Sequence, residues 1–164
     1  MSLMVSEIQR ALPERALLSL AERVAEYVGL ELEQVTLALG PGGLAQFQFS
    51  DADAVVRALG YEPERDAWRE LDAIQAREFL VYNTGHDLAY STRPLRSQAE
   101  CETLCSELLA LIGRPARCFT RHSKLTPEQG THSSNPIRRD WTFSEPYLFV
   151  GEERATLCTF LAED

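Results

Sequence analysis

Basic side chains that could bind an anion are concentrated between residues 114 and 139. This stretch carries six basic residues against one acidic residue, whereas the whole chain of 164 residues has a formal net charge of −9. The guanidinium group of arginine forms paired, charge-assisted hydrogen bonds with carboxylate or phosphate. The candidates for binding an anion or a partner are therefore Arg117, Arg121, His122, Lys124, His132, Arg138 and Arg139.

The spacing of these basic residues is compatible with two interpretations. Arg117 and Arg121 have the same parity on a predicted strand at residues 116–121, so their side chains point to the same side. The connection that follows is long and polar, and structureless connections beyond ~12–15 residues in compact domains are usually functional or disordered. Alternatively, the arginines form ion pairs with carboxylates of the same domain. The sequence leaves both interpretations open.

Histidine and serine residues suggest catalysis or metal binding, but they occur at no known spacing. His132 precedes Ser133 and Ser134, yet the G-x-S-x-G elbow of many serine hydrolases is absent. His86, His122 and His132 do not form a metal-binding pattern such as H-E-x-x-H. His86 falls in a predicted hairpin turn. We therefore predict no metal site and no cofactor, and we assign no catalytic residue.

Four cysteines raise the question of a metal site, a disulfide or a buried core. Cys101 and Cys105 are four residues apart on a predicted helix, a spacing that could hold a metal ion. The same helical stripe continues with Leu104, Leu108 and Ile112, so core packing is the favoured interpretation, also for Cys118 and Cys158. We find no export signal at the N-terminus, and we expect reduced thiols in the cytoplasm.

Aromatic residues are frequent in WTFSEPYLFV at residues 141–150. We favour a core strand, but Pro146 cannot donate a hydrogen bond to a neighbouring strand, which predicts an edge or bulged strand. An aromatic edge strand could also bind a partner. The candidates for a partner-binding strand are Trp141, Phe143, Tyr147 and Phe149.

The negative net charge limits the classes of partner. Nucleic acids and anionic membrane surfaces attract cations, so a net charge of −9 argues against both. No apolar run approaches the ~20 residues that a membrane-spanning helix needs. An acidic surface attracts a basic partner, which favours a role in protein binding.

Hydrophobic periodicity and turn residues predict alternating helices and hairpins. The predicted helices cover residues 13–28, 50–59, 64–76 and 97–112. The predicted hairpins cover residues 33–49, with a glycine-rich turn at 40–43, then 78–92, with a turn at 83–85, and 141–163, with a Gly-Glu-Glu turn. A further strand is predicted at 116–121.

This order of elements predicts one α+β domain over residues 1–164. We expect a mostly antiparallel sheet built from hairpins, with about four helices packed on one of its faces. In size, acidity and helix-then-hairpin order, and in no sequence motif, the chain resembles the acidic chaperones of bacterial secretion systems and the immunity proteins of toxin pairs. Its predicted β-hairpin ending departs from the helical ending of those chaperones, so we assign the chain to neither family.

The favoured function is that of a small acidic cytoplasmic protein-binding module, of an adaptor, chaperone-like or immunity-like kind. Its partner would be another protein or a second copy of the chain. The alternative is a small enzyme or ligand-binding domain that holds an anionic small molecule with the basic loop at residues 114–139.

Overall fold

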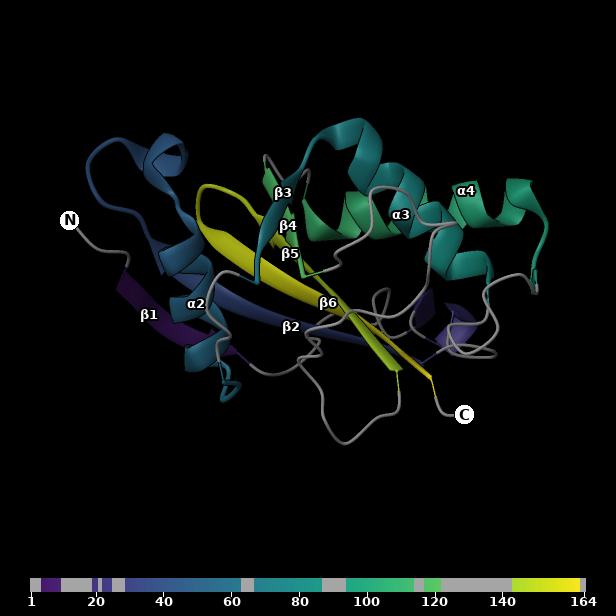
Figure 1. Cartoon of the computed structure of the whole chain (residues 1–164), viewed down its shortest axis with the longest axis horizontal. Helices are drawn as coiled ribbons and strands as arrows, with labels where there is room; N and C mark the ends of the chain where they lie inside the picture. Colours follow the sequence, from purple (N-terminus) through teal and green to yellow (C-terminus); the bar gives the residue numbers. More distant parts are fainter. Residues whose placement is uncertain are drawn as a thin grey trace.

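Six antiparallel strands form one sheet within the part of the chain that the structure describes. This computed structural model describes residues 4–9, 19–20, 22–24, 29–62, 67–86, 94–113, 117–121 and 143–162. The sheet order is β1-β2-β6-β5-β4-β3 (Figure 1). The strands are β1 (Met4–Gln9), β2 (Gly29–Ala38), β3 (Arg69–Leu71), β4 (Arg117–Thr120), β5 (Phe143–Val150) and β6 (Arg154–Ala162).

Three longer helices with described bounds accompany the sheet, and their sequences account for where they begin and end. They are α2 (Phe49–Ala58), α3 (Ala73–Gly85) and α4 (Gln98–Ile112), and a short 3-10 helix, η1 (Gly43–Gln46), precedes α2. The Asp72 side chain accepts a hydrogen bond from the backbone N–H of Gln75 at the start of α3. Ser97 does the same for Glu100 in α4, which ends at Gly113 in the left-handed conformation. The α+β fold class is thus confirmed.

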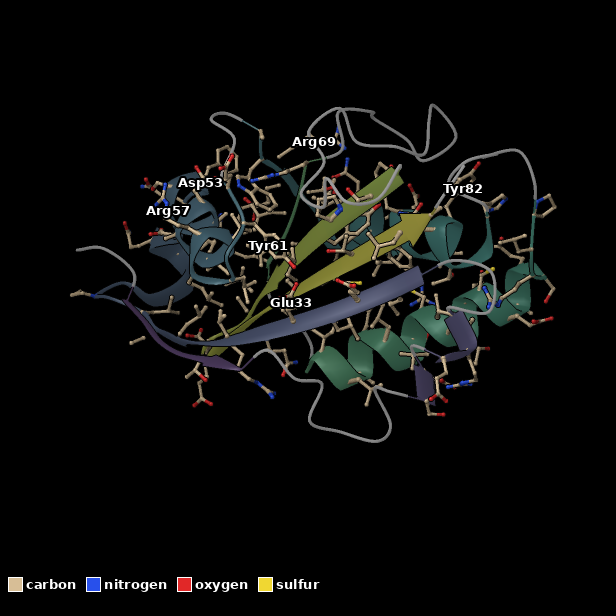
Figure 2. The ribbon with its side chains drawn as sticks, turned by 90° about the horizontal axis from the view of Figure 1, so that it is seen from below. Glu33, Asp53, Arg57, Tyr61, Arg69 and Tyr82 are labelled. Atoms are coloured by element: carbon tan, nitrogen blue, oxygen red, sulfur yellow. The ribbon has the colours of Figure 1, made fainter. Side chains whose placement is uncertain are left out.

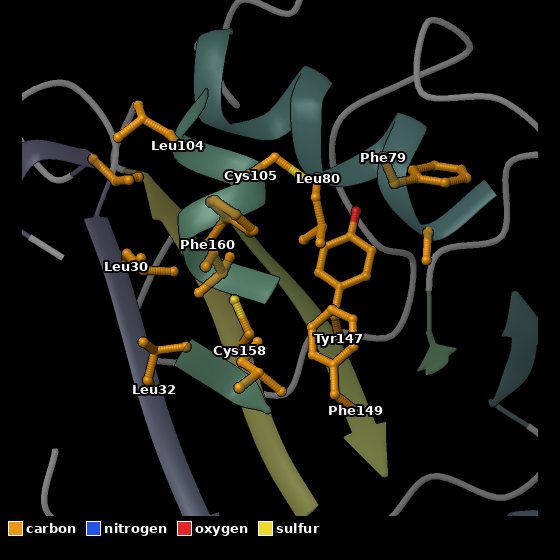
Figure 3. Packing of buried hydrophobic residues seen from close by; sticks show 14 of the residues in the cluster. Leu30, Leu32, Phe79, Leu80, Leu104, Cys105, Tyr147, Phe149, Cys158 and Phe160 are labelled. Carbon is orange, nitrogen blue, oxygen red and sulfur yellow. The ribbon is translucent and has the colours of Figure 1, made fainter. Parts of the chain in front are cut away.

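Helices cover both faces of the sheet, whereas the sequence analysis placed them on one face. Leu32, Cys158 and Tyr147 lie side by side across β2, β6 and β5 and pack in the cluster that contains α3 and α4 (Figure 3). Their neighbours Leu157 and Leu148 point to the opposite face and pack in the cluster that contains α2. With apolar residues on both faces, a strand such as β6 is buried along almost its whole length.

The hairpins predicted at residues 33–49 and 78–92 are wrong. β2 pairs with β1 and β6, and its predicted partner segment instead forms η1 and the start of α2. Residues 78–85 belong to α3, because Asn83, Thr84 and Gly85 end a helix and do not form a hairpin turn. His86, predicted to lie in that turn, caps the C-terminus of α3.

The remaining predicted elements divide into correct, incorrect and undescribed ones. The helices at 50–59 and 97–112, the strand at 116–121 and the final hairpin are confirmed within one or two residues by α2, α4, β4 and the β5–β6 pair. The helix predicted at 64–76 is wrong, since residues 69–71 form β3. Of the helix predicted at 13–28, only residues 19–20 and 22–24 are described, and they are helical.

None of the helices in the described ranges has the length and apolarity needed to cross a membrane.

Candidate functional site

Arg117, the first of the anion-site candidates, is engaged by groups of its own chain. Its Nε and Nη2 atoms lie 2.7 and 2.8 Å from the two carboxylate oxygens of Glu70, in a bidentate ion pair. Its Nη1 donates to the backbone carbonyls of Leu44 and Phe47 at 2.8 and 2.6 Å. The guanidinium lowers the pKa of Glu70, and the carboxylate raises the pKa of Arg117. Arg117 is therefore paired internally, as the second interpretation of the basic residues describes.

Arg117 thus links β4 to β3 and to the segment around η1, which gives a direct prediction. We expect Arg117→Lys to lower the free energy of unfolding by about 1–2 kcal/mol, because lysine cannot reproduce the fork of donors. Urea unfolding measures the loss. The exposed Arg57 on α2 (Figure 2) provides the control, and Arg57→Lys should change stability by less than about 0.5 kcal/mol. Equal stability of the two variants would contradict the structural role of Arg117.

Arg121, the second candidate, is buried with only 1% of its surface exposed. Its guanidinium carbon lies 4.8 Å from the centre of the Trp68 ring. The Trp68 indole N–H in turn donates to Asp53 of α2 at 2.8 Å. Arg117 and Arg121 therefore both lie on the α2 side of the sheet, as their shared parity predicted. Arg121 packs inside this face and does not extend into solvent.

The five remaining candidates lie outside the described residues, so their role as an anion or partner site stays a prediction. They are His122, Lys124, His132, Arg138 and Arg139.

The proposed partner-binding strand is an interior strand of the sheet, which corrects the edge-strand prediction. β5 pairs with β4 on one side and with β6 on the other. Tyr147 and Phe149 are buried in the core, so neither offers a surface to a partner. Trp141 and the side chain of Phe143 lie outside the described part of the chain.

Pro146 fits this interior strand because the β4–β5 ladder ends next to it. The last pair of that ladder is Thr120 with Tyr147, so Pro146 lies one residue beyond it. Its carbonyl accepts a hydrogen bond from the Thr120 hydroxyl at 3.1 Å, and therefore faces the β4 side. In an antiparallel strand, the nitrogen of the same residue faces that side as well. The missing N–H consequently removes no hydrogen bond of the sheet.

A buried polar group lies between β5 and α3, and the sequence analysis did not identify it. Figure 3 shows the Tyr147 hydroxyl pointing from the sheet towards the helices. It accepts a hydrogen bond from the Asn83 side-chain amide and donates to Glu145 Oε2 at 3.4 Å. Burial raises the pKa of the Glu145 carboxyl and of the Tyr147 phenol well above their usual values. Glu145 is therefore held towards its neutral form inside the core.

The alternating pattern of β5 contains a signal for this group. Glu145 has the same parity as Tyr147 and Phe149, so it must share their face of the strand. An acidic residue at a core-facing position predicts either a buried partner or a perturbed pKa.

The four cysteines have free thiols, and all four are buried, as the core interpretation predicts. Cys105 and Cys158 belong to the cluster under α3 and α4 (Figure 3), and Cys118 belongs to the same cluster. Burial raises the pKa of all four thiols, that of Cys105 to about 11. Within the described residues, no group of three or more His, Cys, Asp or Glu side chains is placed to hold a metal ion.

The raised thiol pKa values predict low reactivity in the native state. At pH 8, a thiol with a pKa near 11 has a thiolate fraction on the order of a hundredfold below that of a free cysteine. We therefore expect Ellman's reagent to label the folded protein slowly and all four thiols rapidly in urea. Rapid labelling of two or more thiols before unfolding would contradict the burial.

An open groove runs over the outer surface of α3 and α4. We call it the α3–α4 groove; it has a volume of about 540 Å³ and is lined by Ala73, Ile74, Arg77, Glu78, Val81, Tyr82, His86, Gln98 and Glu102. Among the described residues, the exposed large apolar side chains are Ile74, at 73%, and Phe49, at 48%. Glu78 and Glu102 add negative charge to the lining. The groove therefore combines an exposed apolar surface with acidic side chains.

One end of the α3–α4 groove is ordered by a stacked pair of rings. The rings of Tyr82 and His86 lie 3.8 Å apart and nearly parallel. His86 Nδ1 is 2.9 Å from the Tyr82 carbonyl, so Nδ1 carries the proton that is donated to this oxygen. The Nε2 atom of the neutral ring is then an acceptor. This tautomer would accept a hydrogen bond from a donor in the groove.

A second cavity, nearly as open as the groove, lies beside it, between the start of α3, the end of α4 and the sheet. We call it the apolar cavity; it has a volume of about 410 Å³ and is lined by Leu71, Ala73, Ala76, Arg77, Ser106, Leu109, Ala110, Arg117, Cys118 and Phe149. Ala73 and Arg77 line both spaces.

No family model, no curated protein and no solved structure matches the chain.

Proposed function

We propose that this protein is a small cytoplasmic protein-binding module whose partner docks in the α3–α4 groove. The observation that carries the proposal is the second apolar side of α3. Phe79 and Leu80 pack into the core, whereas Ile74 lines the outer groove with 73% of its surface exposed. Val81 also lines the groove, but it is partly buried against the core cluster. A helix with apolar residues on both sides is expected to bury both sides against other groups. A partner protein would bury the outer side.

The charge of the groove indicates the kind of partner. Two acidic side chains, Glu78 and Glu102, and one basic side chain, Arg77, line it, so the lining is weakly acidic, and the chain as a whole has a net charge of −9. Such a surface accelerates encounter with a basic partner and disfavours an acidic one. We therefore expect an apolar segment flanked by lysine or arginine. A second copy of this acidic chain is the less favoured occupant.

The alternative function, a small enzyme or ligand-binding domain that uses the basic loop at 114–139, has less support. The guanidinium of Arg117 already donates hydrogen bonds to Glu70 and to two backbone carbonyls, and Arg121 is buried against Trp68. An anion would have to displace these contacts or use the five other candidates.

A surface substitution tests the proposed function. We expect Ile74→Glu to weaken capture of partners from native lysate at least tenfold, because a third negative charge would replace the exposed apolar side chain. Ala45→Glu, a substitution at an exposed residue of η1 beyond the opposite face of the sheet, should leave capture unchanged. Captured proteins are identified by mass spectrometry, and self-association is followed by light scattering.

Two results would refute the proposal. The first is an identical set of captured proteins for the wild type and Ile74→Glu. The second is capture that does not weaken when Glu78→Gln and Glu102→Gln are combined, with the exposed turn residue Glu152→Gln as the charge control. Loss of a captured basic protein in the groove variants alone would support it.

A further inference from the structure

We infer that the apolar cavity binds a small monocarboxylate with an apolar body, such as a medium-chain fatty acid. This site goes beyond the proposed function, because it would take a small molecule and not a protein. The cavity volume of about 410 Å³ lies in the range of ~300–1,000 Å³ that is typical of small-molecule sites.

The lining of the cavity favours an apolar ligand body. Leu71, Ala76 and Phe149 come from β3, α3 and β5, so the cavity extends from the helix surface to the sheet. Phe149 and Cys118 at its base are core residues with 1% and 5% of their surface exposed. Transfer of an apolar chain from water to such a surface is favourable in proportion to the apolar area that is buried.

Arg77 favours a carboxylate at one end of this ligand. Its Nη2 donates to Ser106 Oγ at 3.1 Å and lies 3.4 Å from the Glu102 carbonyl, so α4 holds the guanidinium in place. Its Nη1 lies 4.0 Å from Cys105 Sγ, which is only a weak acceptor. Within the described residues, no carboxylate forms an ion pair with Arg77. A half-buried cation held by neutral groups retains its charge for a ligand.

Arg117, the other cation that lines the cavity, is not available to pair with the ligand carboxylate. Arg117 borders the space from β4, but its guanidinium lies on the α2 side of the sheet, where Glu70 compensates its charge through two short hydrogen bonds. Arg77 is therefore the anchor that we assign to the carboxylate. The planar guanidinium suits this group because it can present two parallel donors.

Titration with octanoate, followed by NMR, tests the site, with 1-octanol as the neutral analogue. We expect octanoate to bind with a Kd below about 1 mM and to shift signals of Ala76, Ala110 and Phe149. Because only the carboxylate of octanoate can form an ion pair with Arg77, 1-octanol should bind at least about tenfold more weakly. Arg77→Gln should weaken octanoate binding about tenfold and leave 1-octanol binding unchanged.

Two further variants make the test decisive. Ala110→Trp places a large ring at the exposed rim of the cavity and should abolish binding of both compounds, which keeps the test valid if Arg77→Gln does not fold. Arg57→Gln, on α2 at the opposite face of the sheet, should have no effect. Equal affinities for acid and alcohol, unchanged binding in folded Arg77→Gln or in Ala110→Trp, or no shifts up to about 10 mM octanoate would each overturn the inference.

Discussion

Replacement of Gly85 by alanine is expected to destabilise the protein by about 1–3 kcal/mol, because the new methyl group collides with α4. A Cβ atom at Gly85 would lie 2.2 Å from Cys101 Sγ, far inside contact distance. Both residues are buried, so the collision cannot be relieved in solvent. The opposing effect is smaller: alanine has a helix propensity about 1 kcal/mol better than that of glycine, and Gly85 is only the last residue of α3. The loss from the collision should therefore exceed the gain in helix propensity, so Gly85→Ala should be less stable than the wild type.

A double-mutant cycle in urea unfolding tests this explanation. Cys101→Ala removes the sulfur atom and should cost about 1 kcal/mol through lost packing. In the double variant the two methyl groups no longer collide, so its stability should lie within about 1 kcal/mol of that of Cys101→Ala alone. Strict additivity of the two losses would contradict a direct contact.

Gly151 provides the matched control for the glycine substitution. A Cβ atom there would meet its nearest neighbour, the Arg154 carbonyl oxygen, at an ordinary distance of 3.6 Å. We expect Gly151→Ala to change stability by less than about 0.5 kcal/mol. A comparable loss in both variants would indicate a general effect of alanine and not a specific collision.

The contrast between α4 and α3 shows which elements could be predicted from the sequence. α4 has one apolar stripe between Ser97 and Gly113, so periodicity and both end signals agree. In α3, apolar residues occur on both sides of the helix, which obscures the helical period. The signal that indicates its start is a capping box, Asp72 followed by Gln75. Periodicity alone therefore misassigned a helix that its cap identifies.

The candidate sites were harder to predict because their contacts join distant parts of the chain. Glu70 and Arg117 are 47 residues apart, and Asn83 and Tyr147 are 64 residues apart. No local pattern connects such residues; only the strand order brings them together. The same reason explains the error on β5, since its aromatic residues and Pro146 are equally compatible with an edge strand until β4 is placed beside it.

Replacement of Glu145 by glutamine is expected to change the pH dependence of stability more than any other single carboxyl substitution discussed above. Burial raises the pKa of this carboxyl well above the value of about 4.5 that it has when unfolded. The folded protein consequently holds the proton to a higher pH than the unfolded chain does. The stabilisation is fully present below the unfolded pKa and is lost as pH rises towards the folded pKa.

The size of this effect follows from the linkage between proton binding and folding. Between the two pKa values, each pH unit removes up to about 1.4 kcal/mol of stability. Glutamine is neutral at every pH and keeps an oxygen that can accept the hydrogen bond from the Tyr147 hydroxyl. We therefore expect Glu145→Gln to match the wild type near pH 4 and to exceed its stability by about 1–3 kcal/mol at pH 8.

Urea unfolding of both proteins from pH 4 to pH 8 measures this difference directly, because other titrating groups cancel in the comparison. The exposed Glu152 serves as the control, and Glu152→Gln should differ from the wild type by less than about 0.5 kcal/mol across the range. A constant difference between Glu145→Gln and the wild type would show that Glu145 does not titrate with folding. A wild type that is the more stable protein at pH 8 would show that Glu145 is ionised in the core and held by an opposite charge.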